Sequence, residues 1–335
     1  MSHSQLHTDD SELDGPLLFG RVLDGKGGGR RIDWAEARDW QPGATGEVLW
    51  LHICRSTPGV QQWLEGLGIP EPTAELLVSD ETRPRALREG DTLVSTLRGI
   101  NFNPGAEPED MVAMQLWSDG KRIFTLRRQR LQSPRDVLAE IDAGTGPMDA
   151  GRIVTDMIET LINRMNTSIV DMNTTIDEME EVDSDQDTED FLQRIATIRR
   201  NCLALQRHMA PQHEALETIS RLPLAWFEEE DRREIAESID RLRRFLEDIN
   251  ISKESALVLQ DDIRARAVAR SERTNYLLTI VAAIFLPLGF LTGLMGINVG
   301  GMPGVNDNDG FWIVVGLCCA ILLLQLVLFW KWKWL

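Results

Sequence analysis

Several residue types are scarce in this chain, and each shortage excludes a class of protein. Among 335 residues only four are cysteines: Cys54 and Cys202 are isolated, while Cys318 and Cys319 are adjacent. No disulfide framework or zinc-binding module has such spacing. The chain has 35 Lys and Arg residues and 53 Asp and Glu residues, which gives a net charge of −18. Nucleic-acid-binding domains carry a basic surface, so we expect no nucleic-acid partner. Because no nucleophile elbow, kinase signature or zinc-hydrolase helix occurs, we also expect no enzyme.

Glycine is absent between Gly151 and Gly289, and the only prolines there are Pro211, Pro223 and Pro287. A stretch so free of helix breakers predicts long helices. We expect them over 152–179, over 188–208 with an extension to 219 and a kink at Pro211, and from 228 to about 294. The third would run about 100 Å at 1.5 Å per residue. Its first part carries a 4-3-4-3 apolar seam, typical of a coiled coil, at Ile235, Ile239, Leu242, Leu246 and Ile249.

Charge is absent from two runs near the C-terminus, residues 276–295 and 311–330. Each is long enough to cross about 30 Å of hydrocarbon as a helix. Only residues 296–310 separate them, which predicts a membrane hairpin at the end of a chain that otherwise lies in water.

The flanking charges predict the orientation of this hairpin. Basic residues precede the first run (Arg264, Arg266, Arg270 and Arg273) and follow the second (Lys331 and Lys333). The connecting loop has no Lys or Arg and carries Asp307 and Asp309. By the positive-inside rule both termini lie in the cytoplasm and the loop lies outside. The polar, acidic start of the chain lacks the features of a secretory signal, which agrees with a bacterial inner-membrane location.

The N-terminal part reads as mixed α/β. Strands are predicted over 16–23, 30–34, 48–54, 92–101, 111–117 and 122–127, with turns at Asp24-Gly25 and at 118–121. Helices are predicted over 60–66, 71–78 and 133–141. His52, on an apolar strand, is interpreted as a core histidine. The predicted organisation is an acidic tail (1–14), a cytoplasmic α/β domain (15–147), a region of long helices (148–275) and the transmembrane hairpin (276–335), which ends in a basic tail (331–335).

The first run suits a lining role in an ion path, because small or mildly polar residues recur along it at helical spacing. A two-span chain cannot enclose water alone, so conduction requires a homo-oligomer in the lipid bilayer. The alternative reading is that the small residues only allow close helix packing. The residues that we expect on the path are Glu272, Asn275, Thr279, Leu286, Gly289 and Gly293.

The stretch 273–298, which ends in Gly296-Ile297-Asn298, resembles the CorA superfamily of divalent-cation channels and transporters. The hallmark of that family is Gly-Met-Asn at the outer end of the first span. Isoleucine in place of methionine, followed by 299–304, is similar to the zinc-associated ZntB-like branch. The resemblance covers the whole chain and implies a funnel-shaped homopentamer with the first span around the pore. It also implies that the Asn298 amides ring the outer mouth and meet the hydrated cation. Asp307 and Asp309 would then concentrate cations at this mouth; the alternative is that they are simply solvated loop carboxylates.

The cargo implied by this branch is Zn²⁺, with no resident cofactor. The span offers no His, Cys or carboxylate to a stripped zinc ion, so a Mg²⁺, Co²⁺ or Ni²⁺ channel stays an alternative, as does a non-conducting receptor or scaffold. The sequence leaves open whether protons are a coupling ion and whether transport is uptake or efflux.

Two cytoplasmic features suggest regulatory metal. Residues 177–190 hold nine acids, among them Asp183, Asp185 and Asp187 at calcium-loop spacing, but the glycine and bidentate glutamate of such a loop are missing. A solvated tip between helices is the main interpretation. His208 and His213 flank Pro211 and could ligate zinc, but a polar helix bend is the main interpretation.

Overall fold

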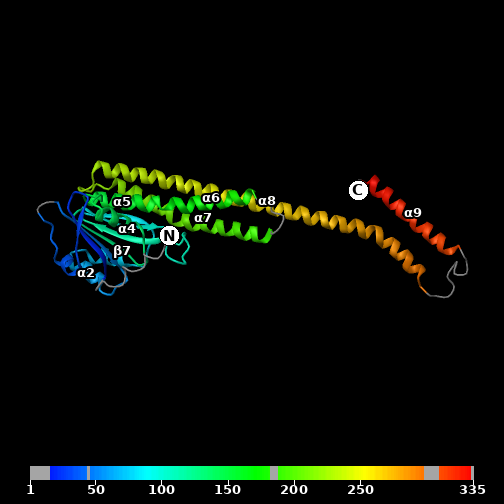
Figure 1. Ribbon diagram of the computed structural model, residues 1–335, viewed down its shortest axis with the longest axis horizontal. Helices are drawn as coiled ribbons and strands as arrows, with labels where there is room; N and C mark the ends of the chain where they lie inside the picture. The colour runs from blue at the N-terminus through cyan, green and yellow to red at the C-terminus, as the bar shows by residue number, and fades with distance from the viewer. Residues whose placement is uncertain (1–15, 44–45, 182–187, 298–308, 333–335) are drawn as a thin grey trace. The chain divides into compact units, whose positions relative to one another are not determined.

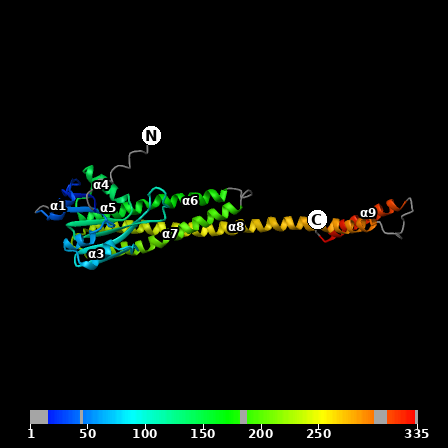
Figure 2. The same ribbon diagram turned by 90° about the horizontal axis from the view of Figure 1, so that it is seen from below.

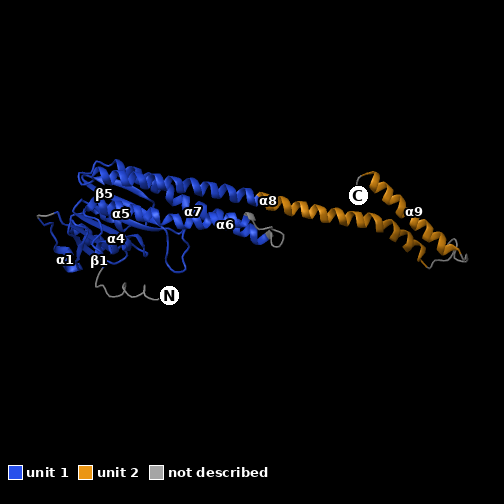
Figure 3. Cartoon of the chain, turned by 45° about the horizontal axis from the view of Figure 1, so that its top comes forward, with its two compact units in different colours: residues 1–260 blue, residues 261–335 orange. Residues whose placement is uncertain are grey.

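The structure is a computed structural model that describes residues 16–43, 46–181, 188–297 and 309–332. It divides into two compact units, residues 1–260 and 261–335 (Figure 3). The first unit holds a sheet with helices on both faces and the start of α8, and the second holds the rest of α8 and α9. The expected class, an α/β domain followed by long helices and two C-terminal apolar helices, is confirmed.

Within the described residues, seven strands form one sheet in the order β2-β1-β3-β7-β6-β5-β4. Their bounds are β1 Leu17–Leu23, β2 Gly29–Arg31, β3 Val48–Cys54, β4 Arg85–Glu89, β5 Thr92–Gly99, β6 Val112–Ser118 and β7 Arg122–Arg127. Only β3 and β7 run parallel, and the other neighbours are antiparallel. The predicted β6–β7 hairpin is confirmed, and its turn needs Gly120, whose φ is +82°.

Three short helices cover one face of the sheet: α1 Trp34–Asp39, α2 Val60–Gly66 and α3 Glu71–Val78. Their apolar side chains join Leu49, Leu51 and Phe124 in one buried cluster. On the other side of β3, the Trp50 indole donates to the Thr125 hydroxyl at 3.0 Å. The same hydroxyl pairs with His52 Nδ1 at 2.9 Å, so the interpretation of His52 as a core residue is confirmed.

The longer helices pack on the second face and extend from it. They are α4 Ser133–Asp142, α5 Ala150–Asn163, α6 Met165–Glu181, α7 Thr188–Arg221 and α8 Glu229–Met295. Figures 1 and 2 show α5, α6, α7 and the first part of α8 side by side as a bundle. Polar contacts join these helices, including Arg152 on α5 with Glu234 on α8 and Gln206 on α7 with Asn250 on α8.

The structure corrects four details of the sequence-based expectations. The strand predicted over 30–34 ends at Arg31, because Asp33 caps a new helix, α1, by accepting from the Glu36 N–H at 2.8 Å. The edge strand β4 was not predicted. The prediction of a single helix over 152–179 is wrong, because the helix is interrupted at Arg164, between α5 and α6. The Arg164 guanidinium donates to both Asp136 carboxylate oxygens at 2.6 and 2.8 Å.

The fourth correction concerns the seam along α8. The predicted positions Ile235, Leu242 and Ile249 are buried, but Ser238 and Phe245 are buried in preference to their neighbours Ile239 and Leu246. The other two long helices agree with expectation, since α7 continues through Pro211 and α8 runs from Glu229 to Met295.

Candidate functional site

Two helices of the second unit are long and apolar enough to cross a membrane: the C-terminal part of α8, and α9 Gly310–Lys331. Large apolar side chains stand exposed along both, among them Leu286 at 70 % and Phe290 at 72 %. In water the exposure of these apolar side chains would be unfavourable, whereas in a bilayer they would contact apolar hydrocarbon. The two predicted spans therefore agree with the observed helices.

The first span has two unlike sides. A half-buried side contains Ile280, Ala283, Ile284, Leu288 and Leu291. Contact with α9 lies on this side, because the Gln325 side-chain N–H of α9 donates to the Ala283 carbonyl at 3.1 Å. These spacings of three and four residues place the five positions on one helical face.

The opposite side carries the residues that we expect on an ion path. Glu272, Asn275, Thr279, Leu286, Gly289 and Gly293 are all exposed in the single chain. At 100° per residue they fall within one arc of the helix, away from the half-buried side. The helix thus brings these six residues together on a surface that α9 leaves open.

Two details of this open side bear on its chemistry. The Thr279 hydroxyl donates to the Asn275 carbonyl at 2.8 Å, which leaves the hydroxyl oxygen available as an acceptor. A shallow hollow is lined by Ala282, Phe285, Leu286, Gly289 and Phe290. At Gly289, one of these lining residues, a Cβ would meet nothing within 4 Å.

The predicted motif lies at the end of this helix. Gly296 closes the last turn, since its N–H donates to the Gly293 carbonyl at 3.1 Å, and Ile297 follows it. Asn298 and Asp307 lie outside the described residues. Asp309 directly precedes α9, and its carbonyl accepts from the Ile313 N–H at 3.1 Å.

Among the residues proposed for regulatory metal, the two described histidines are not brought together. Asp183, Asp185 and Asp187 lie outside the described residues. His208 and His213 stand five positions apart on the unbroken helix α7, about 140° around its axis, so they point in different directions. Burial, helped by Arg98 and Arg207, lowers the pKa of His208 to about 4. In the part of the chain that the structure describes, no three His, Cys, Asp or Glu side chains cluster as metal ligands do.

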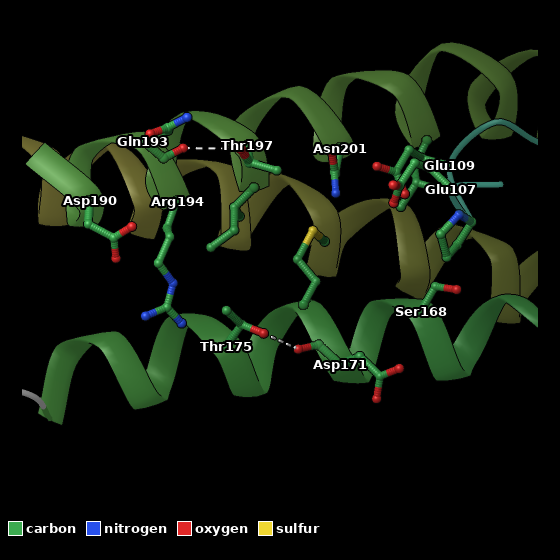
Figure 4. A pocket seen from close by; sticks show the side chains of 14 residues that line it. Glu107, Glu109, Ser168, Asp171, Thr175, Asp190, Gln193, Arg194, Thr197 and Asn201 are labelled. Atoms are coloured by element: carbon green, nitrogen blue, oxygen red, sulfur yellow. Dashed lines mark hydrogen bonds between the residues drawn. The ribbon is translucent and has the colours of Figure 1, made fainter. Parts of the chain in front are cut away.

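A groove that the sequence did not predict lies between α6 and α7 (Figure 4). Its volume is about 570 Å³, and four carboxylates line it: Glu107, Glu109, Asp171 and Asp190. Arg194 is the basic residue among its lining. These residues come from three distant parts of the chain, so their spacing in the sequence carried no signal. The groove is acidic, but its described residues form no chelating cluster.

Comparison with known proteins places this architecture among membrane transporters. Residues 45–331 match the model of the family described as CorA-like Mg²⁺ transporter protein. The divalent cation transporter CmaX of Pseudomonas aeruginosa is 38% identical over 330 residues, covering 95% of this chain and 97% of CmaX. The zinc transport protein ZntB of Yersinia enterocolitica is 34% identical over 324 residues, covering 95% of this chain and 96% of ZntB.

Solved structures give the same grouping. Full-length CmaX superposes with a TM-score of 0.84 at 36% identity and covers 97% of this chain and 100% of its own. The CorA magnesium transporter of Methanocaldococcus jannaschii gives a TM-score of 0.77 over 94% of this chain and 98% of its own; at 14% identity it supports the fold alone. The expectation drawn from residues 273–298 is confirmed at the level of the family: this chain belongs to the CorA-like Mg²⁺ transporter proteins.

Proposed function

We propose that this protein transports divalent cations across the bacterial inner membrane, with Zn²⁺ as its main cargo. The observation that carries the proposal is the open side of the first span. Six residues, which are glycine, polar or, at Leu286, apolar, share one face of this helix. Helix α9 packs against the opposite face. In a ring of copies this open face would turn toward the axis, and α9 would face lipid.

The assembly that fits is a homopentamer. One hairpin leaves the open face exposed, with Leu286 at 70 %, so the face needs further copies to enclose water. Leu286 would form an apolar collar that gates by dewetting, and Thr279 would present a ring of hydroxyl oxygens below it. The amide of Asn298 at the outer mouth would hold the cation through its water shell.

Zinc is favoured over magnesium by the names of several relatives and by Ile297 in place of the methionine of the family motif. Between Tyr276 and Ile297 no His, Cys, Asp or Glu occurs, so the ion would pass this stretch with its water. A rate that depends on a pH gradient would mark protons as the coupling ion.

The test is metal flux into liposomes that carry the purified protein, with Zn²⁺ and Mg²⁺ compared, with and without a pH gradient. Asn298→Ala should abolish most of the flux, whereas Asn306→Ala, in the same loop but outside the motif, should leave it intact. Preference for Mg²⁺ would reassign the cargo. Absence of flux for every divalent cation would refute transport and favour a receptor or scaffold.

Orientation can be tested on intact cells in a variant without the four native cysteines. A cysteine at position 309 should react with a membrane-impermeant maleimide, and one at position 332 should react only after the cells are opened. The reverse pattern would contradict the proposal that both termini are cytoplasmic.

A further inference from the structure

Pro287 lies inside the first span, in the middle of an otherwise continuous helix. Proline has no backbone N–H, so the carbonyl four residues earlier loses its normal helical donor. That carbonyl belongs to Ala283. In hydrocarbon no water can replace the missing donor, and an unpaired carbonyl there is strongly unfavourable.

The second span supplies the missing donor. Gln325 of α9 donates from its side-chain Nε2 to the Ala283 carbonyl at 3.1 Å, across 42 residues of sequence. The bond therefore joins the two spans at the one backbone group that Pro287 leaves open.

The surroundings of Gln325 on α9 are almost entirely apolar. The residue sits in the middle of the half-buried face of α9, whose other members are apolar or nearly so: Val314, Cys318, Ile321, Leu322, Leu328 and the buried Phe329. The Oε1 atom of Gln325 is buried and has no hydrogen-bond partner among the described residues. A leucine would fill the same place without burying this oxygen unpaired. The hydrogen bond from Gln325 Nε2 to the Ala283 carbonyl offsets the cost of burying Oε1 without a partner.

We propose that Gln325 is a positioning residue that replaces the N–H absent at Pro287 and so fixes the first span against the second. Proline bends a helix because its ring crowds the preceding turn and a hydrogen bond is lost. With the Ala283 carbonyl held, the bend has one defined geometry. Leu286 and Gly289 flank Pro287 on the open side, so the bend sets the width of the path beside them. This last step rests on the proposed function.

The test is a double-mutant cycle in the full-length protein. Gln325→Met keeps the length of the side chain but removes the donor. Pro287→Ala returns a backbone N–H to the Ala283 carbonyl. With Pro287 present, Gln325→Met should lower Zn²⁺ flux by roughly 3- to 20-fold, the range for a hydrogen bond between membrane helices. It should also lower the melting temperature in detergent.

In the Pro287→Ala background, Gln325→Met should change neither quantity, because the helix then satisfies its own carbonyl. Pro287→Leu serves as a second donor-restoring background if the alanine variant folds poorly. The matched control is Leu324→Met on the exposed side of α9, where the side chain is 60 % exposed. This substitution should be silent in both backgrounds.

Equal effects of Gln325→Met with and without Pro287 would overturn the inference, and so would no effect in either background. The melting temperatures decide this without any transport. A protein that passes no divalent cation but shows the coupling in its melting temperature would refute the proposed function and retain the pairing of Gln325 with Pro287.

Discussion

Gln212 of α7 forms two hydrogen bonds with the backbone of Arg98 in β5. The Arg98 N–H donates to Gln212 Oε1 at 2.6 Å, and Gln212 Nε2 donates to the Arg98 carbonyl at 3.0 Å. The neighbouring strand β4 pairs with β5 only as far as Thr96. The Gln212 amide therefore takes the place of a strand partner where β4 has ended, and it attaches α7 to the sheet.

Replacement of Gln212 should weaken this attachment. Its side chain is 1 % exposed, so Gln212→Ala would leave a buried N–H and a buried carbonyl without partners. We expect a loss of about 2 kcal/mol, seen as a fall of roughly 4–8 °C in the melting temperature. Gln193→Ala, on the exposed side of the same helix, should change it little. Equal melting temperatures for the two variants would show that the Arg98 contact does not stabilise the fold.

Asp156 on α5 is a largely buried carboxylate among other acids. Its side chain is 12 % exposed and contacts Arg152 at 2.8 Å. Burial raises the pKa of Asp156 from 3.8 to about 7, with further increases from Glu140, Glu234 and Glu159, and the attraction of Arg152 does not offset them. The folded protein thus holds a proton that the unfolded chain releases near pH 4.

Stability should therefore fall as pH rises from about 4 to about 7, because the unfolded state binds fewer protons in that window. The full cost, a few kcal/mol, is present above pH 7. Asp156→Asn mimics the protonated form, so its melting temperature should exceed that of the wild type most at pH 8, by less at pH 5, and should match it only below about pH 4. Asp240→Asn, at an exposed ion pair with Arg243, is the control and should show no such difference. A wild type whose stability does not change between pH 5 and pH 8 would contradict the raised pKa.

How far the sequence predicts this fold depends on where the signal lies. The strands β3 and β7 and the helices α2 and α3 were predicted with their observed bounds, since each has a clear local pattern and flanking turn residues. The strand β4 was missed because it lies at the sheet edge and reads Arg-Ala-Leu-Arg-Glu, with little apolar alternation. The break at Arg164 coincides with a tertiary pair to Asp136, which no local pattern encodes.

The candidate site shows the same division. Helical spacing was enough to place Thr279, Leu286 and Gly289 on one face, because an unbroken helix fixes their directions. The contact between Gln325 and Ala283 needed the structure, since a hairpin loop of unknown geometry sets the register between the spans. The start of α1 could have been predicted from the sequence, because Asp33 followed three residues later by Glu36 is a helix-start signal. The strand predicted over 30–34 was preferred to it.

Gly289 offers a direct test of the open side of the first span. A Cβ at this position would meet nothing within 4 Å, so Gly289→Leu should leave the melting temperature of the protein unchanged or slightly raised. In a ring of copies, however, the added side chains would crowd the axis and should reduce Zn²⁺ flux by about tenfold or more.

The matched control is Gly316→Leu on α9, where a Cβ would also meet nothing within 4 Å. This site should face lipid, so flux should stay at the wild-type rate. Flux that is lost in the Gly316 variant and kept in the Gly289 variant would reverse the roles of the two spans.

The carboxylates of the outer loop should act through charge and not through direct ligation. Asp307 and Asp309 are the only charged residues between 296 and 310, and on the proposed orientation they lie at the mouth of the path. Negative charge there raises the local concentration of divalent cations. Asp307→Asn combined with Asp309→Asn should therefore lower Zn²⁺ flux several-fold in low salt. The difference should disappear near 1 M salt, where the screening length falls to about 3 Å.

The control for net charge is Glu237→Gln, at an exposed acid in the N-terminal part of α8, and it should have no effect. A defect that persists unchanged in high salt would mean that the two carboxylates bind the ion directly.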